Sequence, residues 1–516
     1  MRSRSVVAVF VVGLMLLAAS LGTALSLVGD DEPDASPGGA RSSTTTPVPG
    51  DGVPQELLPF YTQRLAWSGC GERECAELEV PIDYTDPTAG SVRIAVERAA
   101  ATGDRIGSMV VNPGGPGAPG TDVATNAEGY FGRPLLAAYD VVGFDPRGTG
   151  DSDPVDCLTD AELDAYVAED PAPDTKAEER DFVAGLEDFW AGCQERSDEL
   201  VGHVSTVEVA RDMDVLRAAL GEEQLTYFGY SYGTKLGATY AELFPDRVGR
   251  FVLDGAIDPT LSSRDGSLSQ AAGFETALRA YVSDCVDGGN CFLGNSVQEG
   301  LDTISGLLDD IDDRPLPTEG DRELSVGNAF YGVVFPLYYR ELWSALDQGL
   351  SEALAGDGST LLVLSDYYGS REPDGSYADN GLEVISVVNC LDDPEAIDPA
   401  DVESQYPAFT EASPTFGEVF AWGLTGCSGI PFTATDEPDL VIDGAGAAPI
   451  VVIGTTRDPA TPYEEAVALA EQLESGVLIT RDGDGHTGYN KGNACVDGAV
   501  HAYLVDGEVP EDGLQC

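Results

Sequence analysis

Short apolar runs alternate with longer amphipathic stretches along most of the chain. Seven runs have the length of strands, and most are bounded by Gly, Pro or Asp; they cover residues 91–98, 108–112, 139–144, 224–230, 250–254, 449–454 and 476–480. Helix-compatible stretches lie between them. Residues 207–220 are the clearest example, because their apolar positions recur at helical spacing before Gly221, which can end a helix. This alternation predicts an α/β fold with a mostly parallel sheet covered by helices.

The alternation stops after Asp254 and returns at Pro449. Amphipathic stretches and loops rich in Gly, Asp and Pro fill the interval. We therefore expect residues 55–254 and 449–516 to form one core, and residues 255–448 to form an inserted, mainly helical cap over it.

The first residues have the pattern of an export signal. Arg2 and Arg4 precede an apolar run over residues 6–28, which is long for a signal peptide and long enough to span a bilayer. We expect residues 1–28 to be a signal peptide or an N-terminal membrane anchor. Residues 29–54 are rich in Pro, Ser and Thr with almost nothing apolar, which predicts a disordered linker.

The composition of the chain supports a folded protein and excludes one class of function. The 516 residues are 42% hydrophobic, which is enough for a substantial core, and 27 basic residues stand against 90 acidic ones, for a net charge of −63. Such a charge repels phosphate backbones, so it excludes nucleic-acid binding.

Ten cysteines are scattered singly rather than in metal-binding pairs, which predicts disulfides in an oxidising compartment. We expect no metal and no cofactor. Many pairings are possible; short enclosed loops favour Cys70 with Cys75 and Cys285 with Cys291, and the others then pair with their chain neighbours: Cys157–Cys193, Cys390–Cys427 and Cys495–Cys516.

Residues 229–233 read Gly-Tyr-Ser-Tyr-Gly and match the Gly-x-Ser-x-Gly pattern. A strand-like run precedes them and a helix-compatible run follows. A sharp strand-to-helix turn would expose the hydroxyl of Ser231, which makes Ser231 the candidate nucleophile.

A serine nucleophile needs a base, and the chain has three histidines. His486 lies in a glycine-rich loop after the last apolar run, whereas His203 and His501 lie in positions that favour structural roles. Asp458 follows a predicted strand and is our choice for the acid, with Asp254 as its rival. The order Ser231, Asp458, His486 is that of an α/β-hydrolase.

Acyl transfer also needs donors for the oxyanion. The segment Asn112-Pro113-Gly114-Gly115-Pro116-Gly117 follows a predicted strand and can present backbone N–H groups. Gly115 is the first choice and Gly114 the second, with the amide of Tyr232 as partner.

Together these motifs resemble the secreted tripeptidyl aminopeptidases of actinobacteria, α/β-hydrolases related to prolyl aminopeptidase. The resemblance includes further segments at residues 80–84, 144–150, 244–246, 252–255, 389–392 and 458–462. It implies a cap that selects short peptides and, from prolyl aminopeptidase, acidic cap residues that bind the substrate's free amine. Glu341 and Asp392 are candidates for that role.

The predicted function is therefore an exported serine peptidase that acts near a free N-terminus, with short peptides as substrates. It would be secreted or held at the outer face of the cell envelope. A carboxylesterase or lipase with the same triad is the alternative. An inactive envelope binding protein is a third hypothesis, against which the intact triad argues.

Overall fold

The computed structural model describes residues 52–197, 199–434 and 440–516. Ten strands form one sheet: β1 (Ser68–Cys70), β2 (Arg73–Pro81), β3 (Ser91–Ala99), β4 (Gly107–Asn112), β5 (Tyr139–Phe144), β6 (Leu225–Tyr230), β7 (Val248–Asp254), β10 (Ile450–Arg457), β11 (Gly476–Asp484) and β12 (Leu514–Gln515). The seven predicted strands correspond to β3 to β7, β10 and β11. The predicted signal or anchor (1–28) and nearly all of the predicted linker (29–54) lie outside the described residues.

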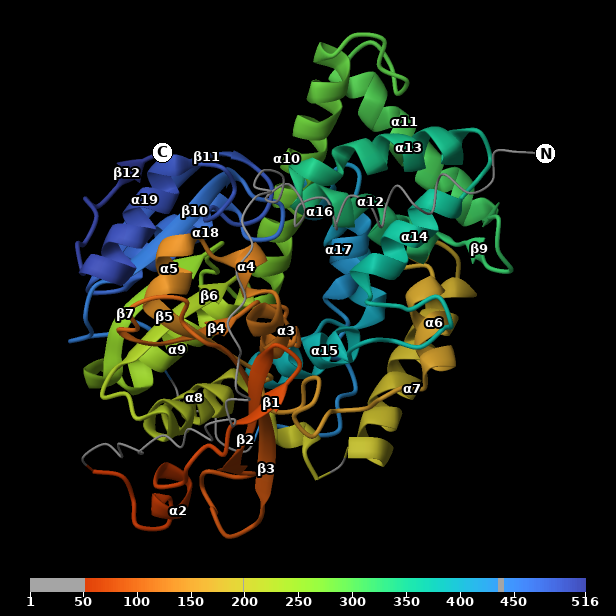
Figure 1. The fold of residues 1–516 in the computed structure, drawn as a ribbon. Helices are drawn as coiled ribbons and strands as arrows, with labels where there is room; N and C mark the ends of the chain where they lie inside the picture. Colours follow the sequence, from red (N-terminus) through yellow and green to blue (C-terminus); the bar gives the residue numbers. More distant parts are fainter. Residues whose placement is uncertain (1–51, 198, 435–439) are drawn as a thin grey trace, which may run out of the picture.

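The strand order is β1-β2-β3-β5-β4-β6-β7-β10-β11-β12 (Figure 1). Pairs from β5 through β12 are parallel, and those from β1 through β5 on the other side are antiparallel. The sheet is therefore mostly parallel, as the sequence predicts, and its parallel strands carry their carboxyl ends to one edge.

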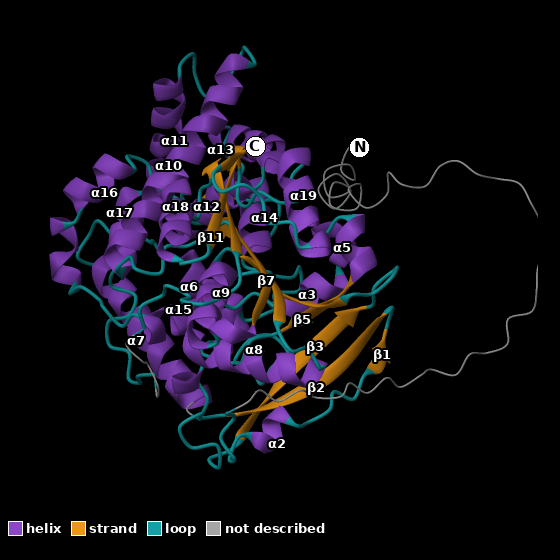
Figure 2. Ribbon diagram, turned by 90° about the vertical axis from the view of Figure 1, so that its left-hand side faces the viewer, coloured by secondary structure: helices purple, strands orange, loops and turns teal. Residues whose placement is uncertain are grey.

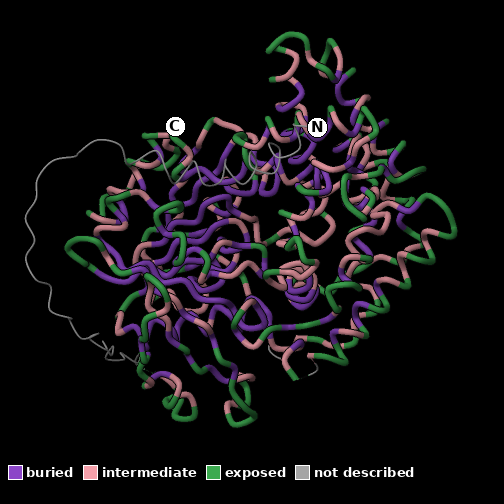
Figure 3. The backbone as a smooth tube through the Cα atoms, turned by 45° about the vertical axis from the view of Figure 1, so that its right-hand side comes forward, coloured by how far each residue is buried: buried purple, intermediate pink, exposed green. Residues whose placement is uncertain are grey.

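Both faces of the sheet are covered by helices (Figure 2). Val110 and Tyr227 pack on the face covered by α8 (Thr206–Leu220), α9 (Tyr232–Leu243) and α18 (Tyr463–Gln472). Met109 and Phe228, one position away on each strand, face α3 (Gly120–Thr125), α4 (Ala127–Tyr130), α5 (Arg133–Ala138) and α19 (Ala494–His501). This alternation buries the central strands on both sides, which the buried traces of Figure 3 show.

Within the predicted insertion, residues 255–434 form a helical layer at the carboxyl edge of the sheet (Figure 1). Its helices are α10 (Ser263–Asp287), α11 (Val297–Asp313), α12 (Val326–Val334), α13 (Trp343–Leu354), α14 (Ser359–Tyr368), α15 (Gly381–Asp392), α16 (Tyr406–Ala412) and α17 (Gly417–Gly423), with a short hairpin of β8 (Leu316–Pro317) and β9 (Glu323–Leu324). Much of this layer packs around its own hydrophobic cluster.

The helical layer also draws on residues before 255. The excursion between β5 and α8 forms α6 (Asp160–Ala168) and α7 (Glu178–Ser197), which lie beside the cap rather than on the sheet (Figure 1). Phe182 of α7 packs edge-on against Trp422 of α17. Glu383 of α15 accepts the backbone N–H groups of Cys157 and Leu158. Two separate chain segments therefore build the cap layer.

Five disulfides join the pairs that chain neighbourhood predicts: Cys70–Cys75, Cys157–Cys193, Cys285–Cys291, Cys390–Cys427 and Cys495–Cys516. None of them links the 255–448 insertion to the sheet. Within the described ranges, no helix combines the length and the apolar character needed to cross a bilayer.

Candidate active site

Ser231 lies on a sharp turn between β6 and α9. Its backbone has φ 55° and ψ −125°, a conformation that L-residues rarely adopt. The flanking chain packs too closely for side chains, since a Cβ at Gly229 would lie 2.3 Å from the carbonyl oxygen of Gly233. The Ser231 amide donates to the carbonyl oxygen of Asp254 at 2.9 Å, which fixes the turn to β7. The turn has the strained backbone of a nucleophile elbow.

His486 follows the end of β11 and is buried beside Asp458, which follows β10. The Nδ1 atom of His486 lies 2.8 Å and 2.9 Å from the two carboxylate oxygens of Asp458. The Asp458 carboxylate also accepts the amides of Ala460, Thr461 and Thr487, each at 3.0 Å. These bonds fix both carboxylate oxygens, so Asp458 can orient the imidazole through Nδ1.

Asp254, the rival acid, binds elsewhere. Its carboxylate is buried and accepts the amides of Gly488 and Tyr489 at 2.7 Å and 2.8 Å. Burial raises the pKa of Asp254 to about 6. Asp254 therefore anchors the loop that follows His486, whereas Asp458 contacts the imidazole itself.

The opposite ring nitrogen, Nε2 of His486, is buried and makes no hydrogen bond with any described residue. From the cap side, the carbonyl oxygen of Tyr338 accepts the His486 amide at 2.8 Å. The ring of Tyr338 lies perpendicular to the imidazole, with 5.4 Å between the ring centroids. The histidine is therefore held by the core through Asp458 and by the cap through Tyr338.

The glycine-rich segment after β4 lies against the elbow. A Cβ at Gly114 would lie 2.7 Å from the carbonyl oxygen of Tyr230 and 2.8 Å from Cβ of Ser231. The Gly114 amide donates to the side chain of Asn112 at 3.0 Å, which engages this second-choice donor. Gly115, the first choice, lines the same cavity as Ser231. The amide of Tyr232 lies next to this segment, 3.2 Å from the Cβ position of Gly114. Gly115 and Tyr232 are therefore the candidate oxyanion donors.

Ser231, Gly115 and His486 line one cavity of about 490 Å³, which we call the main cavity. Its cap side is aromatic and is formed by Tyr166, Tyr331, Phe335, Tyr338, Tyr339 and Tyr368. Asp379 is the one acidic residue among the lining residues, which include no Lys or Arg. This cavity is large enough for a short peptide, and it brings the predicted nucleophile, base and oxyanion donor to one place.

The remaining candidates lie outside this cavity. His203 faces Glu208, with 3.3 Å between Nδ1 and the carboxylate, and His501 lies 2.9 Å from the hydroxyl of Tyr489. Asp392 pairs with Lys235 at 2.7 Å and also accepts bonds from Thr206. Asp392 is therefore a tie between α15 and the core. Glu341 lines a smaller neighbouring cavity.

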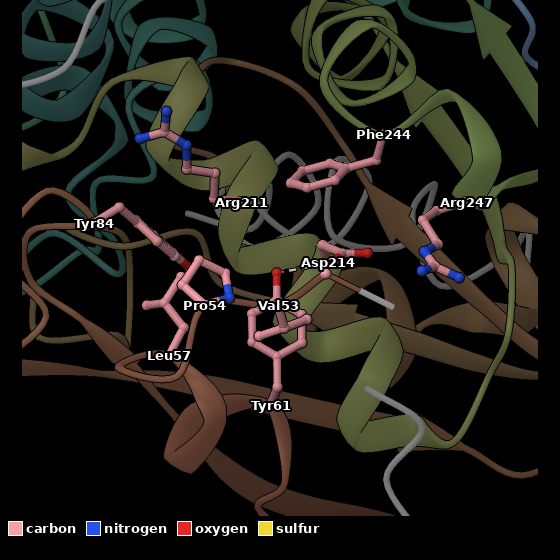
Figure 4. A pocket seen from close by; sticks show the side chains of 10 residues that line it. Val53, Pro54, Leu57, Tyr61, Tyr84, Arg211, Asp214, Phe244 and Arg247 are labelled. Carbon is pink, nitrogen blue, oxygen red and sulfur yellow. Dashed lines mark hydrogen bonds between the residues drawn. The ribbon is translucent and has the colours of Figure 1, made fainter. Parts of the chain in front are cut away.

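A further cavity of about 340 Å³ lies where the first described residues meet α8 (Figure 4). Asp214 in its wall is already bonded to Tyr61 at 2.8 Å and to Arg217 at 2.6 Å. None of Ser231, Asp458 and His486 lines it. The predicted chemistry therefore does not belong to this cavity.

Two contributors to the site carry no local sequence signal. Asp379 lies in a loop rich in Gly and Asp, one of many such loops in this acidic chain. Tyr338 acts through its carbonyl oxygen, which every residue possesses. Asn112, by contrast, has a local sequence signal, because it stands just before the glycine-rich segment. Its side-chain oxygen accepts the Gly114 amide, which makes Gly114 the weaker candidate for an oxyanion donor.

Comparisons with known proteins identify relatives of this chain. A family model described as TAP-like protein matches residues 413–516. Serine protease Hip1 of Mycobacterium tuberculosis is 38% identical over 484 residues, covering 89% of this chain and 92% of that protein. Carboxylesterase B of the same organism is 38% identical over 480 residues, covering 89% and 91%. Tripeptidyl aminopeptidase of Streptomyces lividans is 33% identical over 468 residues, covering 86% and 83%.

Sequence identity of 33% to 38% over most of this chain and of each relative establishes that they are homologous. The mostly parallel sheet and the order of the predicted triad agree with this relationship. The chain belongs to the TAP-like family of serine hydrolases, within the α/β-hydrolases.

Proposed function

We propose that the protein is an exported serine peptidase that cleaves peptide bonds near a free N-terminus through an acyl-enzyme at Ser231. The observation that carries the proposal is the main cavity, which places Ser231, Gly115 and His486 opposite an aromatic cap wall that contains one carboxylate. The relatives named as a serine protease and as a tripeptidyl aminopeptidase support a peptide substrate.

In this mechanism Nε2 of His486 takes the proton of the Ser231 hydroxyl as the oxygen attacks the peptide carbonyl. Asp458 holds the imidazole through Nδ1 and stabilises its protonated form. The amides of Gly115 and Tyr232 stabilise the oxyanion. Nε2 then gives its proton to the departing amine, and water releases the acyl segment by the same steps.

Asp379 supplies the preference for a free amine. Its Oδ1 atom accepts the Gly381 amide at 2.9 Å, so the carboxylate is fixed at the end of a turn. Burial and the nearby carboxylates of Asp145 and Asp379 raise the pKa of Asp122, so the Asp379 carboxylate lies among other acidic groups. A protonated α-amine is the group of a peptide that such a site attracts.

The test compares a tripeptidyl aminomethylcoumarin amide with its N-acetyl counterpart. The purified enzyme should cleave the free-amine substrate at least about tenfold better, since an ion pair with a partly buried carboxylate is lost on acetylation. Asp379→Asn should remove this difference mainly by raising KM. Asp374→Asn, in the exposed part of the same loop, should retain it.

Ser231→Ala should abolish cleavage in every case. Equal cleavage of both amides would contradict the exopeptidase proposal. Turnover of short-chain esters without any amide cleavage would instead favour the carboxylesterase function that the name of one relative suggests.

The disulfides support the proposal that the protein is exported from the cytoplasm. Five bridges form among the described residues, and structural disulfides persist in oxidising compartments outside the cytoplasm. The apolar run over residues 6–28 would direct export. Fractionation of the native host with an antibody to the folded part would test this directly; recovery of the enzyme in the cytosol would contradict it.

A further inference from the structure

A second cavity adjoins the main cavity at His486. Its volume is about 220 Å³, and Tyr338, Tyr339 and His486 line both cavities. The residues that line only the second cavity are Arg340, Glu341, Arg481, Asp484, Gly485 and Lys491. The two cavities therefore differ in character, because the first is aromatic with one carboxylate and the second is rich in charged side chains.

Three of the chain's 27 basic residues line this small cavity. Arg340 is neutralised by carboxylates of Asp284 at 2.6 Å and Asp484 at 3.6 Å. Arg481 and Lys491 differ from Arg340 in having no such ion pair in the part of the chain that the structure describes. Within the described residues, neither Arg481 nor Lys491 has a carboxylate oxygen within 4 Å, although the chain holds 90 acidic residues.

Arg481 and Lys491 are held in place by other means. One guanidinium nitrogen of Arg481 donates to the carbonyl oxygens of Asp484 and Thr487, on either side of His486. The ammonium of Lys491 lies 5.1 Å from the ring centroid of Tyr339. Burial lowers the pKa of Lys491, although the nearby Glu341 and Asp254 oppose this shift. Two oriented, half-buried cations thus have no carboxylate oxygen within 4 Å of them among the described residues.

The reaction places one part of the substrate beside these cations. When the acyl-enzyme forms, the bond between the carbonyl carbon and Oγ of Ser231 forms, and the bond from that carbon to the departing nitrogen breaks. The departing nitrogen receives its proton from Nε2 of His486. The leaving segment therefore starts beside His486, one of the three residues that line both cavities.

We propose that the second cavity is the subsite for the leaving segment, and that Lys491 and Arg481 bind a carboxylate of that segment. This inference rests on the proposed peptidase function. The carboxylate can be an acidic side chain next to the cleaved bond or the C-terminus of a short peptide. Both sources offer the same chemistry, and the cations would favour either over a neutral group.

Four pentapeptides test the proposal, with product masses showing the cleaved bond. They are Ala-Ala-Ala-Ala-Ala as the free acid and as the C-terminal amide, and the amides of Ala-Ala-Ala-Glu-Ala and Ala-Ala-Ala-Lys-Ala. The free acid, the Glu peptide or both should have kcat/KM about tenfold above the neutral amide, as for a hydrogen bond to a charged group. The free acid reports a bound terminus and the Glu peptide a bound side chain.

Lys491→Gln should reduce that ratio about fivefold, and Lys491→Glu should favour the Lys peptide instead. Lys176→Gln is the matched control, because Lys176 is exposed, pairs with Glu179 and lines neither cavity; it should retain the wild-type ratio. Equal kcat/KM for all four peptides, or unchanged ratios in both Lys491 variants, would overturn the proposal. If the wild-type enzyme cleaves esters but none of the pentapeptides, the peptidase function itself fails, and this outcome is distinguishable because no ratio exists.

Discussion

Two buried aspartates contact the loop of His486, and each has a different role. Asp458 binds Nδ1 of the imidazole with both oxygens, while Asp254 binds the amides of the next loop residues. Only the first contact can set the tautomer of the histidine. The chain order alone allows either aspartate, because Asp254 ends β7 and Asp458 follows β10, the neighbouring strand of the sheet.

Asparagine substitutions at these two positions should therefore have different effects. Asp458→Asn should lower kcat by about 10³-fold to 10⁴-fold with little change in folding, because the amide favours the wrong tautomer of His486. Asp254→Asn should lower kcat by about tenfold, because it removes one acceptor from the loop anchor. Steady-state kinetics on the free-amine tripeptidyl amide would measure both, with circular dichroism as the check on folding. A larger loss at Asp254 than at Asp458 would reverse the assignment.

At the scale of elements, the site depends on close packing between the backbones of two loops. The segment after β4 meets the turn between β6 and α9, and Gly114 lies at the point of contact with a φ of 105°. A side chain there would be strained by its backbone conformation and would also collide with Tyr230 and Ser231. The two loops can therefore hold nucleophile and oxyanion donors in register only if this position is glycine.

Gly114→Ala should lower kcat/KM by at least about a hundredfold, since displacement of an oxyanion donor has effects of this size. It should also lower the melting temperature. Gly129→Ala is the matched control: Gly129 lies in α4, and a Cβ there would meet nothing within 4 Å. Kinetics and thermal unfolding of both variants would check the prediction, and wild-type activity in Gly114→Ala would contradict it.

Elements with a strong local pattern were predictable from sequence, and those with a mixed pattern were not. The central strands are buried on both faces and read as apolar runs. Strand β2, next to the edge strand β1, alternates exposed charged residues such as Glu77 and Glu79 with buried Leu78 and Val80, so no continuous apolar run predicts it. In the site, the elbow and the histidine loop have local signatures. Asp379 and Lys491 reach their cavities only through tertiary packing, so no local pattern marks them.

At the scale of the whole molecule, the cap is held to the core by hydrogen bonds and packing. No disulfide crosses between the 255–448 insertion and the sheet. Ser269 of α10 donates to Glu465 of α18 at 2.6 Å, and Lys235 of α9 pairs with Asp392 of α15. The carbonyl oxygen of Tyr338 accepts the His486 amide. Of these contacts, the one that includes Glu465 depends on the ionisation of a buried carboxyl group.

The last prediction concerns the stability of the folded chain against pH. Burial raises the pKa of Glu465 to about 7 and that of Asp254 to about 6. The folded state therefore keeps protons that the unfolded state releases near pH 4, so the free energy of unfolding falls as pH rises from about 4 to 7. Repulsion within a chain of net charge −63 adds to this decline.

Scanning calorimetry should accordingly give a melting temperature that falls from pH 5 to pH 8 in low salt. Sodium chloride at 1 M should reduce the decline, because it screens repulsion between surface charges. Glu465→Gln cannot ionise, so it should reduce the fall by about 2 °C even if it lowers the melting temperature at every pH. The exposed Glu411→Gln is the control and should retain the wild-type slope. A wild-type melting temperature that rises over this pH range would show that the buried carboxyls ionise without cost, and that other contacts control how the cap is held.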